Sequence, residues 1–220
     1  MPTVPPVSPA ILLPADFCAT YIPVAKAACS SIKMAIRRLY GMPDPAPWWT
    51  IHQTKWPLTI EHDHPEVLRG MVRSGHRLFT CVRNPWDRLH AVWRHKFHLD
   101  RWNDLSQHHQ HLRIDMKFVE FVRALENIDL ESANEHLRPQ MDILWPLSQQ
   151  IEDGAVLHVE TLAGDWTYFW HNILMRKNAP PLPHINHGGS RDQGGAYDRG
   201  TRDRVEKLYA KDVHMLGYSF

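Results

Sequence analysis

Two short stretches of the chain combine a basic side chain with neighbours that suit the binding of a phosphate or sulfate group. The first reads Lys26-Ala27-Ala28-Cys29-Ser30-Ser31, and the second begins at Arg83. The small residues of the first stretch let its backbone approach an anion closely, while Lys26 and the two hydroxyls can hold the anion's oxygens. The planar guanidinium of Arg83 can grip a phosphate through two parallel hydrogen bonds. These residue types predict a ligand that carries phosphate groups.

Each stretch follows an apolar, β-prone run, at 17–24 and at 76–82, and precedes apolar residues at helical spacing. A third such run lies at 155–159 and is also followed by a helical pattern. This alternation predicts an α/β, three-layer fold with a central parallel sheet flanked by helices. Both stretches would then follow the carboxyl ends of strands, where open parallel sheets bind their ligands.

Composition narrows the class of protein. The chain has 220 residues, of which 43% are hydrophobic, so we expect one domain over 1–220 with a flexible N-terminal segment at 1–15. A formal charge of +1 gives no general field for gripping nucleic acid or an anionic membrane. Three cysteines without a C-x-x-C spacing, and no signal-peptide or membrane-spanning pattern, indicate a cytoplasmic location.

Several familiar motifs are missing from the sequence. A nucleotide-triphosphate P-loop ends in Gly-Lys-Ser/Thr, and the chain contains no Gly-Lys dipeptide, which disfavours a kinase. The dinucleotide fingerprint G-x-G-x-x-G, the zinc-protease motif H-E-x-x-H and the hydrolase elbow G-x-S-x-G are also absent. His108, His109 and His111 lie in a polar stretch without a cysteine or carboxylate pattern, so no metal site is predicted there.

Four segments resemble those of the sulfotransferases that use 3′-phosphoadenosine 5′-phosphosulfate, in particular the carbohydrate-type branch. The stretch 26–33 is similar to the family's 5′-phosphosulfate loop, and 83–97 is similar to its 3′-phosphate segment. Residues 134–140 resemble a His-x-x-Pro-Gln element, and 208–218 resemble the family's C-terminal ending. These segments occur in the family's order over almost the whole chain, which makes the likeness more specific than either anion-binding stretch alone.

The resemblance implies transfer of a sulfuryl group from 3′-phosphoadenosine 5′-phosphosulfate, as co-substrate, to a hydroxyl-bearing acceptor, with a carbohydrate favoured, and without a metal. Lys26 would stabilise the charge that develops on the leaving 5′-phosphate. Ser30 and Ser31, with the backbone N–H groups of the loop, would hold its oxygens, and Arg83 would take the 3′-phosphate. The sequence departs from the family pattern at Ala25, where the family has proline, and at Ala91, where a serine would contact the 3′-phosphate.

A base must accept the proton of the attacking hydroxyl. The segment Glu61-His62-Asp63-His64 lies between the two anion-binding stretches, where related enzymes supply a catalytic histidine or glutamate. His62 is slightly preferred over His64, and Asp63 would orient either ring. A surface or core role for both histidines is the alternative.

Two other functions remain open from the sequence. The residue at 91 keeps a catalytically silent domain that binds nucleotide or glycan as one alternative, and a P-loop-type kinase is a less favoured one. Tryptophans 48, 49 and 56 either stack on a sugar or adenine ring or cover ordinary core. The sequence indicates no oligomeric state.

Overall fold

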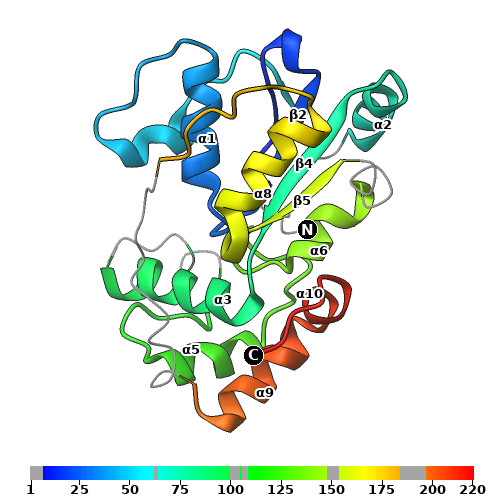
Figure 1. The fold of residues 1–220 in the computed structure, drawn as a ribbon. Helices are drawn as coiled ribbons and strands as arrows, with labels where there is room; N and C mark the ends of the chain where they lie inside the picture. The colour runs from blue at the N-terminus through cyan, green and yellow to red at the C-terminus, as the bar shows by residue number, and fades with distance from the viewer. Residues whose placement is uncertain (1–6, 62–63, 100–104, 106–108, 148–153, 184–196) are drawn as a thin grey trace. The chain divides into compact units, whose positions relative to one another are not determined.

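The computed structural model describes residues 7–61, 64–99, 105, 109–147, 154–183 and 197–220 (Figure 1). The chain forms two compact units, each built from separate stretches. One unit comprises 8–82 and 144–187 and contains the sheet. The other comprises 1–7, 83–143 and 188–220 and is helical in its described part. The single domain expected over 1–220 stays a prediction.

The first unit is built on a five-stranded mixed sheet of order β3-β1-β2-β4-β5. Its strands are β1 (Ala10–Leu12), β2 (Ala19–Ile22), β3 (Thr59–Ile60), β4 (Arg77–Val82) and β5 (Ala155–His158). Strands β2, β4 and β5 are parallel, with Tyr21 opposite Phe79 and Cys81 opposite Leu157, whereas β1 pairs antiparallel with β2 and β3. The α/β class is confirmed, with an antiparallel edge added to the predicted parallel sheet.

The three predicted strands correspond to β2, β4 and β5. In β4 every residue from Leu78 to Val82 is buried, as expected of a parallel strand that is covered on both faces. The N-terminal segment differs from the flexible stretch expected up to residue 15. Ala10, Ile11 and Leu13 are at most 2% exposed, and β1 occupies a place inside the sheet because these apolar side chains gain burial there.

Helices of the same unit cover the sheet. They are α1 (Cys29–Leu39) and α8 (Leu162–Tyr168), which continues into η6 (Phe169–Ile173) and lies across the front of the sheet in Figure 1. The helix α2 (Pro65–Arg73) also belongs to this unit. Short turns complete the unit: η1 (Ala15–Phe17), η2 (Trp48–Gln53), η4 (Trp145–Leu147) and η5 (Val159–Thr161). One core joins α1, alternate strand residues and α8 with η6; it contains Ile32, Ile36, Tyr21, Phe79, Leu157, Trp166, Phe169 and Trp170.

The helical unit contains α3 (Pro85–Trp93) with its extension η3 (Arg94–Leu99), α5 (Phe118–Leu125), α9 (Arg199–Leu208) and α10 (Ala210–Met215). The helix α6 (Gln140–Leu144) begins in this unit. Helices α3, α5 and α9 lie beside one another (Figure 1) and share a core that includes Leu89, Phe121, Val122, Val205 and Tyr209. No helix in the described part of the chain is long and apolar enough to span a membrane.

Candidate functional site

The loop that follows β2 has an unusual backbone. Lys26 and Ala28 have φ angles of +65° and +55°, whereas Ala25 and Ala27 are not among the residues with positive φ. Alternation of this kind occurs in concave anion-binding loops, and in this loop Ala27 N donates to the carbonyl of Val24 over 3.2 Å. The left-handed region disfavours residues that carry a Cβ, and such strain is concentrated at functional sites. The strained backbone therefore marks this loop as the candidate site.

The helix α1 begins directly after this loop. Its N-cap residue is Ala28, which has no side chain able to accept a hydrogen bond from the first turn, and the turn contains no acidic residue. The first intrahelical bond runs from Ile32 N to Ala28 O over 3.1 Å. Because the N-terminus of a helix carries partial positive charge and N–H groups without intrahelical partners, this end attracts an anion.

The two serines of the first turn are largely buried, with Ser30 at 6% and Ser31 at 7% exposure, and Ala27 is fully buried. Lys26 is partly buried, and Cys29, the first residue of α1, is a free thiol that is partly exposed. The six residues of the sequence-predicted loop therefore lie together, Lys26 to Ala28 in the turn after β2 and Cys29 to Ser31 in the first turn of α1. Burial restricts the hydroxyls of Ser30 and Ser31 to few directions, which suits a positioned donor.

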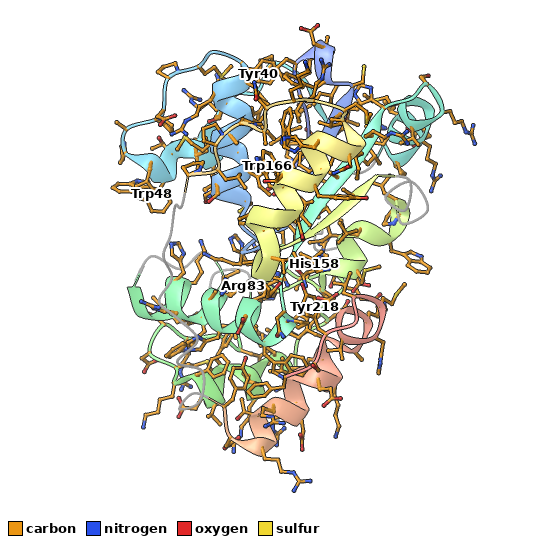
Figure 2. All side chains as sticks on the ribbon, in the orientation of Figure 1. Tyr40, Trp48, Arg83, His158, Trp166 and Tyr218 are labelled. Carbon is orange, nitrogen blue, oxygen red and sulfur yellow. The ribbon has the colours of Figure 1, made fainter. Side chains whose placement is uncertain are left out.

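His52 is a residue of this loop region that the sequence did not indicate. It lies on η2, and its Nε2 is 2.9 Å from the Oγ of Ser30. The element is fastened to α1 at a second place, because Nη1 of Arg37 donates to Oγ1 of Thr54 over 3.1 Å. Trp48, at the start of η2, forms an edge-to-face pair with Trp49, which is 59% exposed (Figure 2).

Only one of the two histidines proposed as the base lies among the described residues. His62 lies outside the described residues, as does Asp63. His64 is described as exposed, and its Nδ1 lies 3.3 Å from Oε1 of Glu66. The role of either histidine as a base stays a prediction.

In the helical unit, Arg83 occupies the position just before α3 (Figure 2). Its backbone is held by the buried side chain of Gln140, because Arg83 N donates to Oε1 over 2.9 Å and Nε2 donates to Arg83 O over 2.8 Å. The next residue, Asn84, caps α3 by accepting from Trp86 N and also donates to the carbonyl of Ser219. The backbone that carries the guanidinium is thus fixed from two sides.

Gln140 is itself held by a buried carboxylate on α10. Asp212 is fully buried, and its Oδ2 accepts from Gln140 N over 2.9 Å and from Gln140 Nε2 over 3.2 Å. Its Oδ1 accepts from Met141 N over 2.8 Å. Burial raises the pKa of Asp212, while the charge of Arg88 and the N–H donors oppose that rise. This network explains two segments of the sequence together, namely the one around Pro139-Gln140 and the C-terminal one.

The remaining side chains of α3 have distinct surroundings. Arg88 is 2% exposed and donates to the backbone carbonyls of Arg138 and Glu135. Ala91 is partly buried on α3 and offers no hydroxyl. His90 packs on Phe118, and burial, followed by the charges of Arg94 and Arg83, lowers its pKa. Arg83, before the start of α3, and Arg94, at its end, thus place positive charge near His90.

No group of three or more histidine, cysteine, aspartate or glutamate residues that could hold a metal ion occurs among the residues described. Of the histidines around position 110, His108 lies outside them, and Nε2 of His109 accepts from Asn134 N over 3.4 Å.

The comparisons with known proteins bear on the whole of this arrangement. A family model described as the sulfotransferase family matches residues 18–219. The match takes in the loop after β2, the segment that begins at Arg83 and the network around Gln140 and Asp212. No curated protein and no solved structure matches the chain significantly.

Proposed function

The chain belongs to the sulfotransferase family, whose members take the sulfuryl group from 3′-phosphoadenosine 5′-phosphosulfate, and we propose that it sulfates a hydroxyl group of a carbohydrate. The observation that carries the proposal is the loop from Lys26 to Ser31, which combines left-handed backbone, an uncapped helix start and two buried hydroxyls. Each of these features favours an oxyanion.

In this proposal the loop holds the 5′-phosphosulfate, and the Arg83 segment holds the 3′-phosphate. The acceptor oxygen forms a bond to sulfur while the bond from sulfur to the 5′-phosphate oxygen breaks. Lys26 stabilises the negative charge that appears on the departing phosphate, and Ser30 and Ser31 donate to its oxygens. The hydroxyl proton passes to a histidine, His62 or His64. The chemistry of this step requires no metal.

The carbohydrate acceptor rests on two supports. The sequence segments resemble the carbohydrate-type branch of the family, and the exposed Trp49, paired with the partly buried Trp48, offers an aromatic face of the kind that stacks on sugar rings. A cytoplasmic location is also part of the proposal, because Cys18, Cys29 and Cys81 are free thiols.

Thermal shift with 3′-phosphoadenosine 5′-phosphate tests the donor site, because a ligand that binds only the folded state raises the melting temperature. We expect a shift for the wild type that shrinks in both Lys26→Ala and Arg83→Ala. The exposed residues Lys55 and Arg199 supply matched controls, since Lys55→Ala and Arg199→Ala remove the same charges elsewhere.

Three outcomes separate the hypotheses. No shift at saturating bisphosphate would refute the donor site, and a shift with ATP and magnesium in its place would favour a kinase. Binding of the bisphosphate without transfer of sulfate to any carbohydrate in an acceptor panel would identify a silent binding domain. Binding together with transfer would establish the proposed activity and its acceptor class.

A further inference from the structure

The contact between Ser30 and His52 joins the donor loop to an element that follows α1 in the sequence. The atoms Oγ and Nε2 are 2.9 Å apart, within the range of a well-formed hydrogen bond. The serine is 6% exposed, so its hydroxyl has little freedom to seek water instead. The direction in which this bond donates decides what the hydroxyl presents to a ligand.

A serine hydroxyl has one hydrogen and two lone pairs, and a neutral imidazole nitrogen is either a donor or an acceptor. If the hydroxyl donates to a bare Nε2, it can offer a bound anion only its lone pairs, which repel the anion's oxygens. If Nε2 carries a hydrogen and donates to Oγ, the hydroxyl hydrogen is released to donate to the anion. Donation from the Ser30 hydroxyl to an oxyanion in the loop therefore requires the state in which His52 donates.

The placement of His52 is supported on both sides along the chain. Ile51, the preceding residue, is fully buried and anchors η2 against α1. Thr54, two residues after His52, accepts a hydrogen bond from Arg37. The neighbouring Arg38 binds both carboxylate oxygens of Asp44, at 2.9 and 2.6 Å. The segment 44–54 is thus fastened along α1, which holds the imidazole over the first turn of the helix.

We infer that His52 is a positioning residue of the donor site, which donates from Nε2 to the Ser30 hydroxyl and so turns that hydroxyl into a donor for the 5′-phosphate. This inference rests on the proposed function and adds to it a residue that acts through Ser30. It also gives η2 a role in donor binding. The histidine itself takes no part in bond formation.

A double-mutant cycle tests the inference by isothermal titration of 3′-phosphoadenosine 5′-phosphate into the wild type, His52→Ala, Ser30→Ala and the double variant. Loss of a neutral hydrogen bond predicts a dissociation constant about 3- to 10-fold higher for His52→Ala. In the Ser30→Ala background the same change should have no effect, because the hydroxyl that it orients is gone. His52→Gln keeps an N–H donor and should restore most of the affinity. Gln53→Ala, an exposed neighbour on η2, is the control.

The inference is overturned if His52→Ala weakens binding equally in both backgrounds, if His52→Gln binds as poorly as His52→Ala, or if neither substitution has an effect. Because His52 is exposed, the variants should fold, and their melting temperatures without ligand check this. The same four proteins are also titrated with inorganic phosphate, and the NMR shifts of the loop amides then measure binding to the loop alone. If the wild type binds phosphate but not the bisphosphate, the proposed function is refuted, and the phosphate titrations still test the role of His52. If the wild type binds neither ligand, the proposed function and the inference about His52 are both overturned.

Discussion

Replacing Asp212 by alanine should destabilise the protein strongly, because this carboxylate satisfies three buried donors. It accepts from the backbone and side chain of Gln140 and from Met141 N, at 2.8 to 3.2 Å, and is fully buried. Each buried donor left without an acceptor costs about 1–3 kcal/mol, and the three share one network, so we expect a total loss of about 3–5 kcal/mol. The same change frees the side chain that holds the backbone of Arg83.

Urea unfolding of wild type and Asp212→Ala measures this loss as a decrease in the free energy of unfolding. Asp203→Ala is the matched control, because Asp203 is exposed on α9 and its loss should change stability by about 0.5 kcal/mol or less. The reasoning is refuted if both variants unfold at the same urea concentration with the same slope. In that case the donors around Gln140 would have found other acceptors.

Two further outcomes follow from the backbone of the loop and from α3. Ala28→Gly should raise the free energy of unfolding by up to about 1 kcal/mol, since glycine tolerates a φ of +55° and the entropy of its unfolded chain offsets only part of the gain. Ala35→Gly, inside α1, should be destabilising in the same urea assay, and equal losses for both would contradict the assigned strain. A phosphate bound at Arg83 should raise the lowered pKa of His90, because its negative charge favours the protonated ring. Binding then takes up a proton, so the affinity for the bisphosphate should rise as the pH falls from the pKa of His90 in the complex to its pKa in the free protein. NMR titration of the His90 ring with and without bisphosphate measures both pKa values, and an unchanged pKa, or a pH dependence of affinity that persists in His90→Val, would contradict this.

The strands at the centre of the sheet were predictable from the sequence because they are buried on both faces. Residues 78–82 form a continuous apolar or small run, which is typical of a parallel strand. Strands β1 and β3 were missed because β1 has three residues and β3 has two, and because prolines surround them. Strands this short have no periodicity of their own, and pairing in the folded chain defines them.

The candidate site was predictable where chemistry is local to one segment. The loop from Lys26 to Ser31 reads as an anion-binding stretch from residue types alone. The left-handed angles at Lys26 and Ala28 leave no signal, because glycine usually marks such positions. The approach of His52 to Ser30 depends on how a proline-rich segment folds back on α1, and such long-range contacts are not encoded in the spacing of residues.

The division of the chain into two discontinuous units has a consequence for biosynthesis. The sheet unit needs β5 and α8, and the helical unit needs α9 and α10, so both wait for segments that leave the ribosome late. Until β5 emerges, one edge of β4 lacks its partner strand, and Phe79 lacks the aromatic cover of Trp166 and Phe169. Nascent chains that display an unpaired strand and apolar rings are prone to aggregate. Synthesis of this protein should therefore depend on a holding chaperone more than synthesis of a chain whose units are each continuous.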